Sequence, residues 1–192
     1  MEDEKRRPAK VKPRIKRSDW IKAALDALED GGIEGIRIER LAENLGVSKS
    51  GFYYHFKDRD DLLEKLLDHW LTLDGTPLFR ERMFENATPA QRLEIVSEVV
   101  DKAQLGRYDI AIRQWARQNP KVKRIWRGEM NKRLSHIRGL FEALGFEGDD
   151  LEMRTRTFVG YQVSEQELFP ELSIKEKEVM RRNRIAMFTK RD

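Results

Sequence analysis

The chain of 192 residues contains no cysteine. Disulfides, thiolate zinc sites and a cysteine nucleophile are therefore excluded. No apolar run approaches the roughly 20 residues that span a bilayer, and the charged N-terminus is not followed by the apolar segment of a secretory signal. From these absences we expect a cytoplasmic protein without a membrane helix.

Signatures of catalysis are also missing. There is no GxSxG, Walker or GxGxxG motif, and His55, His69 and His136 do not pair at the helical spacing of metal ligands. The acidic cluster in residues 58–68 is better explained by helix capping and a solvated face than by Mg²⁺ binding. We therefore expect no enzyme activity, no bound metal and no cofactor, and a helical enzyme is the weakest interpretation.

Positive charge is only slightly in excess, because a charged fraction of 38% leaves a net charge of +4. The total therefore does not indicate nucleic-acid binding, but its distribution is uneven. Residues 1–15 form a basic arm interrupted by two prolines, and we expect this arm to be disordered when free. It either lies along DNA or serves as a solubilising tail.

Nearly every periodic segment has the period of an α-helix, and none alternates as a strand does. Ile21, Ala24, Leu25 and Leu28 show this period in the first helix, which the glycine pair 31–32 is expected to end. The fold class is therefore predicted to be all-α, with about nine helices.

Helix boundaries are predicted from capping and breaking residues. Asp58 is expected to cap one long helix, and capping boxes at residues 88–91 and 173–176 are expected to start two others. Gly106 is expected to separate two helices of the second half.

The stretch IRIERLAENLGVSKSGFYYHF, residues 36–56, carries most of the functional information. A short apolar helix ends before Gly46, and Ser48 stands where a second helix needs an N-cap. This pattern predicts a helix-turn-helix. Its second helix would present donors, small residues and aromatic tips to a major groove, so double-stranded DNA is the expected partner.

The wider unit GVSKSGFYYHFKDRDDLL, preceded by SDWIKAALDALEDGG, resembles the DNA-binding domain of the tetracycline-repressor (TetR) family of bacterial transcription regulators. The resemblance covers roughly residues 16–73. One departure is Arg37, which stands near a position where the family often has Thr or Ser; it either reaches a phosphate or is simply solvated.

Within this unit, the start of the second helix is expected to point into the groove. Lys49, Ser50 and Tyr54 would contact either base edges or phosphates, whereas Tyr53, His55 and Lys57 are expected to anchor phosphates. Phe52 and Phe56 are expected to be core residues. The predicted DNA-binding residues are Arg37, Ser48, Lys49, Ser50, Gly51, Tyr53, Tyr54, His55 and Lys57.

The later helices resemble the regulatory domain of that family in layout only. The resemblance implies a bundle that binds a small molecule, with the last two helices pairing with a second copy. Aromatic residues at helical spacing are individually more often core than pocket, but as a group they suit a planar or apolar ligand. The predicted pocket residues are Trp70, Tyr108, Ile112, Trp115, Trp126, Phe158 and Gln162. The predicted dimer residues are Leu151, Phe158, Val159, Val163, Ile185 and Phe188.

The sequence thus divides into an arm (1–15), a helix-turn-helix domain (16–60) and a regulatory, ligand-binding and dimerisation domain (61–192). The favoured interpretation is a homodimeric transcriptional regulator, a repressor, that binds a palindromic operator and responds to a small-molecule effector. The alternative is an architectural, nucleoid-associated DNA-binding protein without an effector.

Overall fold

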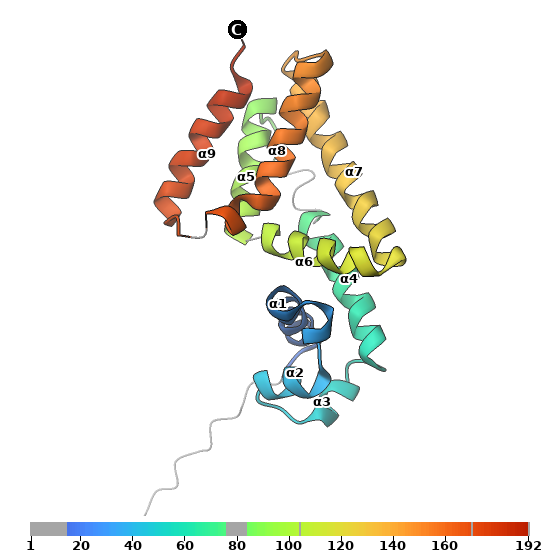
Figure 1. Ribbon diagram of the computed structural model, residues 1–192. Coiled ribbons are helices and arrows are strands. Elements are labelled where there is room, and N and C mark those ends of the chain that lie inside the picture. Colours follow the sequence, from blue (N-terminus) through green and yellow to red (C-terminus); the bar gives the residue numbers. More distant parts are fainter. Residues whose placement is uncertain (1–14, 76–83, 104, 170, 192) are drawn as a thin grey trace, which may run out of the picture.

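The computed structural model describes residues 15–75, 84–103, 105–169 and 171–191. These residues form nine helices and no strand, so the prediction of an all-α fold is confirmed (Figure 1). The helices are α1 (Arg17–Gly35), α2 (Ile38–Asn44), α3 (Lys49–Tyr53), α4 (Arg59–Gly75), α5 (Pro89–Ala103), α6 (Leu105–Gln118), α7 (Pro120–Ala143), α8 (Gly148–Leu168) and α9 (Ile174–Thr189). In this described part, no helix combines the length and apolarity that crossing a membrane requires. All of the basic arm except residue 15 lies outside the described residues.

Two glycines shape the N-terminal helices. Gly32 has a φ of 63° and is not helical, so the regular first helix ends at the glycine pair as predicted, and a short further turn within α1 runs to Gly35. Gly46 has a φ of 66° and makes the predicted turn between α2 and α3.

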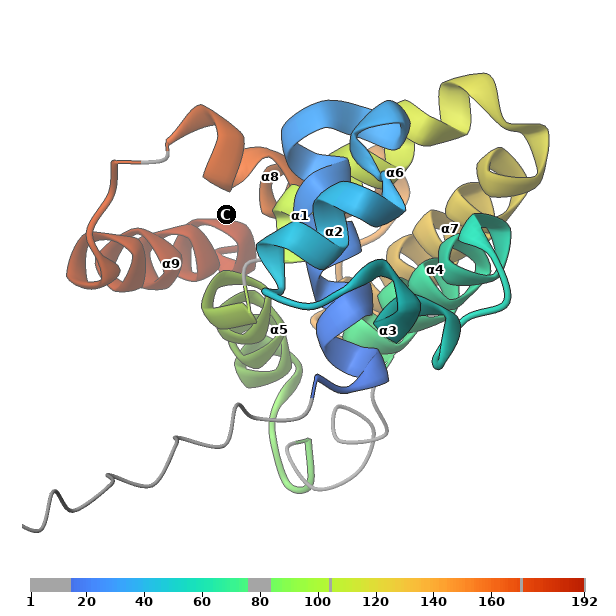
Figure 2. The same cartoon turned by 90° about the horizontal axis from the view of Figure 1, so that it is seen from below.

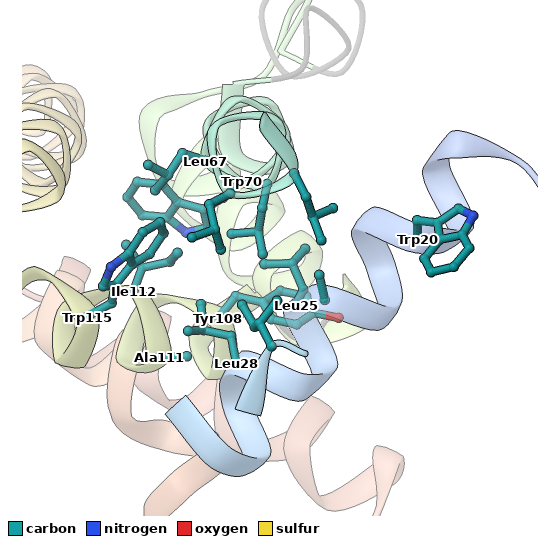
Figure 3. Close-up of a cluster of buried hydrophobic side chains, with 14 of the residues drawn as sticks. Trp20, Leu25, Leu28, Leu67, Trp70, Tyr108, Ala111, Ile112 and Trp115 are labelled. Atoms are coloured by element: carbon teal, nitrogen blue, oxygen red, sulfur yellow. The ribbon is translucent and has the colours of Figure 1, made fainter. Parts of the chain in front are cut away.

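A first hydrophobic core runs without interruption from the N-terminal helices into the bundle. It begins with Trp20 of α1, continues along the apolar stripe of α4 to Trp70, and reaches Ile112 and Trp115 of α6 (Figure 3). Figure 1 shows α6 lying across the molecule, directly above α1. The boundary predicted after residue 60 therefore does not separate two hydrophobic cores.

A second core joins α5, α7, α8 and α9. Phe141 occupies its centre, with its ring centroid 5.9 Å from that of Phe158 and 6.2 Å from that of Phe188. Edge-on and tilted contacts of this kind suit the quadrupole of aromatic rings. The last helix is thus attached to the bundle by apolar packing from within one chain.

The predicted caps are confirmed at three of four helix starts. Asp58 accepts a hydrogen bond from the backbone N–H of Asp61, and the boxes at residues 88–91 and 173–176 both form. Ser48 occupies the N-cap position of α3, but its hydroxyl contacts the hydroxyl of Ser50, 2.7 Å away, instead of a backbone N–H.

The predicted boundary between two helices lies just before Gly106: α5 ends at Ala103 and α6 begins at Leu105, so Gly106 is itself the second residue of α6. A Cβ at this position would come within 3.0 Å of the carbonyl oxygens of Gln162 and Val163 in α8. The glycine is therefore needed for the close approach of α6 to the backbone of α8.

We predict that Gly106→Ala lowers the free energy of unfolding by about 1–3 kcal/mol, because the two backbone carbonyls of α8 must move to admit the methyl group. Gly128→Ala in α7 is the matched control, since a Cβ at this position would have nothing within 4 Å, and it should stabilise the chain by roughly 0.5–1 kcal/mol. Urea denaturation measures both. Equal stability of the two variants would contradict the packing role of Gly106.

Candidate nucleic-acid interface and its links to the bundle

The short helix α3 is held in place from its inner side. Phe52 is fully buried, with its ring 5.4 Å from that of Trp20 in an edge-on contact and 5.2 Å from that of Phe56. The expectation that Phe52 and Phe56 are core residues is confirmed. A helix of one and a half turns is unstable alone, so this anchoring fixes which of its side chains face outward.

The outer side of α3 exposes polar and aromatic side chains. Ser48, Lys49 and Ser50 are exposed at its start, and Tyr53 and Tyr54 at its end are 54% and 70% exposed. The view from below shows α3 beside α2 on the same face of the molecule (Figure 2). Hydrogen-bond donors and phenol rings are therefore exposed together along this short helix.

Lys49 forms an ion pair with Glu39 across the turn between α2 and α3. This hydrogen bond raises the pKa of Lys49 and lowers the pKa of Glu39. Both side chains are exposed, so water screens the attraction and the pair can open readily. Lys49 can thus exchange the carboxylate for another anion without a large rearrangement.

The other predicted contact residues differ in their surroundings. Arg37 is exposed at the N-cap of α2 and donates to the carbonyl of Glu34 at 3.3 Å. Lys57 is exposed after α3. The imidazole Nε2 of His55, however, is 3.2 Å from the carbonyl oxygen of Ile15, so His55 fastens the start of the described chain.

Gly51 faces inward, because a Cβ there would lie 3.9 Å from both Trp20 and Val47. Any contact it makes with a ligand would therefore be through its backbone.

The sequence did not predict the role of Arg59, whose side chain joins α4 to the helix-turn-helix unit. Arg59, the first residue of α4, donates from Nε to the carbonyl of Ile36 at 2.8 Å and from Nη2 to that of Ile33 at 2.5 Å. The end of α1 and the start of α4 are thereby joined, so α4 and the helix-turn-helix are coupled at this point.

Five of the seven predicted pocket residues lie together. Trp70, Tyr108, Ile112 and Trp115 are buried in the first core, and Trp126 packs against it (Figure 3). Phe158 belongs instead to the second core, and Gln162 is buried beside the hydroxyl of Ser97. The aromatic group therefore gathers where α4, α6 and α7 meet.

Asp109 is the polar centre of that junction. Its carboxylate accepts a hydrogen bond from the indole N–H of Trp70 at 2.9 Å and two from Arg133 at 2.6 and 3.1 Å. Asp109 follows the core spacing of Leu105, Ile112 and Ala116, so an acid within an apolar helical stripe was the signal that could have revealed it.

A second polar link connects α6 to α1. Asp26 accepts hydrogen bonds from Arg107 at 2.9 Å and from the hydroxyl of Tyr108 at 3.1 Å, and Glu29 lies 3.2 Å from the same guanidinium. The bundle therefore touches the N-terminal unit both through α4 and through this α1–α6 contact.

Most predicted dimer residues are not on the surface. Leu151, Phe158, Ile185 and Phe188 are buried in the second core of the same chain, and Val159 packs against it. The sequence argument assumed that this apolar surface exceeded what one chain can hide, but the partial ring of α5, α7, α8 and α9 encloses it.

Exposed apolar side chains do occur on the last two helices. Apart from Tyr53 and Tyr54, every exposed large hydrophobic side chain of the described residues lies between residues 153 and 187. They are Met153, Leu168, Phe169, Ile174, Val179, Met180 and Met187.

Among the same described residues, no group of three His, Cys, Asp or Glu side chains is placed to hold a metal ion.

Comparison with known proteins finds a family match for the N-terminal unit. Residues 21–66 match the family described as "Bacterial regulatory proteins, tetR family". The chain is 41% identical over 63 residues to the tetracycline repressor protein class C of Escherichia coli, a match that covers 33% of this chain and 29% of that protein. The chain thus matches less than a third of the length of this curated relative.

Solved structures share the fold over nearly the whole chain. The transcriptional regulator FadR from Bacillus subtilis, in complex with stearoyl-CoA, has a TM-score of 0.66 at 17% identity, covering 91% of this chain and 98% of that one. AibR, in complex with isovaleryl coenzyme A and operator DNA, has a TM-score of 0.68 at 17% identity, covering 89% and 96%. At these identities the likeness establishes the arrangement of the helices.

The buried ion pair predicts a pH dependence of stability. Burial raises the pKa of Asp109 to about 7 and lowers that of Arg133 to about 9. The pKa of an unfolded Asp is about 3.9, so between about pH 4 and pH 7 the folded chain keeps a proton that the unfolded chain has released. The contribution of Asp109 to the free energy of unfolding therefore falls as the pH rises through this window.

We expect the wild type to lose more stability than Asp109→Asn between about pH 5 and about pH 8, because Asn does not titrate. Asp30→Asn, which changes an exposed side chain of α1, should keep the wild-type profile. Urea denaturation at both pH values measures the difference. Parallel profiles for wild type and Asp109→Asn would show that Asp109 does not titrate in this way.

Proposed function

The chain belongs to the TetR family of bacterial regulatory proteins, and from this premise we propose that it is a transcriptional repressor that releases its operator when it binds a small molecule. The observation that carries the proposal is the exposed surface of α3. Its inner residues are fixed by Trp20 and Phe56, while Lys49, Ser50 and Tyr54 project outward.

In this proposal α3 is the recognition helix. A major groove is wide enough for an α-helix, and the first residues of such a helix reach base edges while flanking donors hold phosphates. Lys49, Ser50 and Tyr54 are the candidates for base contacts, and Tyr53 and Lys57 for phosphates. A repressor that acts on the bacterial chromosome would work in the cytoplasm.

The first core is the proposed effector site. It brings rings from α4, α6 and α7 together, so a ligand inserted there would contact the helix that continues into the DNA-binding unit. Two proteins of this fold were crystallised with coenzyme A thioesters, one of them also with operator DNA, which supports an effector with an apolar part.

Ligand binding would change operator affinity through two contacts. Displacing Trp70 alters the hydrogen bond that joins α4 to Asp109, and shifting α6 alters the contact of Arg107 with Asp26. Either movement changes the position of α3. The two states then differ in operator affinity, and the ligand shifts their populations.

A homodimer follows from the requirement to bind two half-sites of a palindromic operator. The proposed interface is the exposed side of α8 and α9, where Met153, Gly160 and Leu168 share one face of α8 and Met180 and Met187 lie on α9. Two copies of these helices would bury apolar side chains that one chain leaves in water.

The alternative remains an architectural DNA-binding protein without an effector. It is favoured if a broad screen of metabolites finds no ligand that changes operator affinity. The buried aromatic cluster would then be a packed core and nothing more.

Recognition by α3 predicts two kinds of mutant. On an operator selected from a genomic library, Lys49→Ala or Tyr54→Ala should weaken binding by about tenfold to a hundredfold and relax base preference. Lys57→Ala should weaken binding to all duplexes similarly and reduce the salt slope by about one unit. Electrophoretic titration at several salt concentrations separates these effects.

Lys102→Ala on α5 is the control, because it removes an exposed cation outside the DNA-binding unit and should leave both quantities unchanged. Unchanged operator affinity after simultaneous alanine substitution of Lys49, Tyr53 and Tyr54 would show that α3 is not the reading helix.

The dimer prediction has a matched pair of glycine variants. Gly160 of α8 and Gly139 of α7 are both exposed, and no atom lies within 4 Å of the position that a Cβ would take on either. Gly160→Arg should give monomers with reduced operator affinity, because it places a long charged side chain in the proposed interface. Gly139→Arg should remain dimeric.

Light scattering coupled to size exclusion measures the mass of each variant. A monomeric wild type, or a dimer that tolerates Gly160→Arg, would rule out the α8 interface.

A further inference from the structure

Residues 110–128, from the second turn of α6 into the first half of α7, contain six basic residues and no acidic residue. They are Arg113, Arg117, Lys121, Lys123, Arg124 and Arg127. This local excess contrasts with the nearly balanced charge of the whole chain and exceeds its entire net charge of +4. Such a concentration indicates an anionic partner.

Only one of the six is neutralised within the described part of the chain. Lys121 pairs with Glu64 of α4 at 2.6 Å. The other five are exposed, and no ion pair joins any of them to an acidic side chain among the described residues. We call these five, Arg113, Arg117, Lys123, Arg124 and Arg127, the basic patch.

The basic patch lies at the corner between α6 and α7. Figure 1 shows α1 between α6 and the α2–α3 pair, so this corner is separated from the proposed recognition helix. DNA held by α3 would therefore meet the N-terminal helices first, which makes the operator a poor candidate for the partner of the patch.

Trp126 connects the basic patch to the first core. Its ring packs against that core, and the guanidinium carbon of Arg113 lies 6.0 Å from the ring centroid. Its indole N–H is buried and has no hydrogen-bond partner among the described residues. A buried donor without an acceptor is costly, so a ligand that offered an acceptor here would gain a hydrogen bond.

We infer that the basic patch binds the phosphates of a coenzyme A thioester whose acyl group enters the first core. The inference rests on the proposed function and specifies its effector. Such a thioester joins an apolar chain to a nucleotide with several phosphate charges, which matches an aromatic core bordered by unpaired cations. Guanidinium groups bind phosphate through paired hydrogen bonds, and Arg113 with Trp126 offers a stacking surface for the adenine.

The test uses the full chain and three probes: dodecanoyl-CoA, dodecanoate and free coenzyme A. Binding is followed by tryptophan fluorescence and calorimetry. The wild type should bind dodecanoyl-CoA at least tenfold more tightly than dodecanoate, with an affinity that falls as salt rises. The triple variant Arg117→Gln/Lys123→Gln/Arg127→Gln should lose tenfold or more in affinity for the thioester and nothing for dodecanoate.

The control variant Lys102→Gln/Arg138→Gln/Lys190→Gln removes three exposed cations outside the patch and should bind the thioester as the wild type does. The inference is overturned if the patch variant binds dodecanoyl-CoA normally, if the wild type binds no thioester, or if the patch variant loses affinity for duplex DNA instead. Thioester binding that depends on the patch but leaves operator affinity unchanged would support this inference and refute the proposed function.

Discussion

The structure depends on α6, which packs against α1 of the DNA-binding unit and against α7 and α8 of the bundle. On one side it holds Asp26 of α1 through Arg107 and Tyr108, and on the other Asp109 holds the indole of Trp70 and the guanidinium of Arg133. Both links are polar and at least partly buried. Their hydrogen bonds therefore fix the positions of the helices relative to one another, whereas apolar packing alone would let the helices slide. A buried ion pair adds little net stability compared with well-packed apolar residues. Its effect here is to define how α4, α6 and α7 meet.

The sequence predicted the fold class, the helix-turn-helix and most helix starts because these depend on local signals. Helical periodicity, the positive φ at Gly46 and the capping boxes each involve residues a few positions apart. The outer surface of α3 followed in part for the same reason: once Phe52 faces inward, the helical repeat turns Ser50 and Tyr53 away from the core. The helix-turn-helix has few alternative arrangements, so local pattern and tertiary structure agree there.

Predictions that required tertiary packing were less complete. A glycine near a helix boundary suggests only a helix breaker, and the approach of the α8 backbone is what explains the glycine in the first turn of α6. Phe158 and Phe188 were assigned to a subunit interface because the sequence shows much apolar surface on the last two helices. In the folded chain, α5 and α7 cover this surface. His55, assigned to phosphate, lies against the carbonyl of Ile15, forty residues earlier in the chain. Periodicity determines which face of a helix is apolar, but it does not determine which element covers that face.

The continuity of the first core has a consequence for regulation. Arg59 holds the start of α4 against the end of α1, and Trp70 holds the second half of α4 against Asp109 of α6. A movement of one end of α4 would therefore also move the other end. A ligand that binds one position of Trp70 better than another by about 3 kcal/mol changes the ratio of the two states more than a hundredfold. Burial of one additional ring or a few methylene groups supplies energy of this order. Under the proposed function, the aromatic cluster would therefore shift the equilibrium between the two states without any contact between the ligand and α3, provided that α6 and α4 move together.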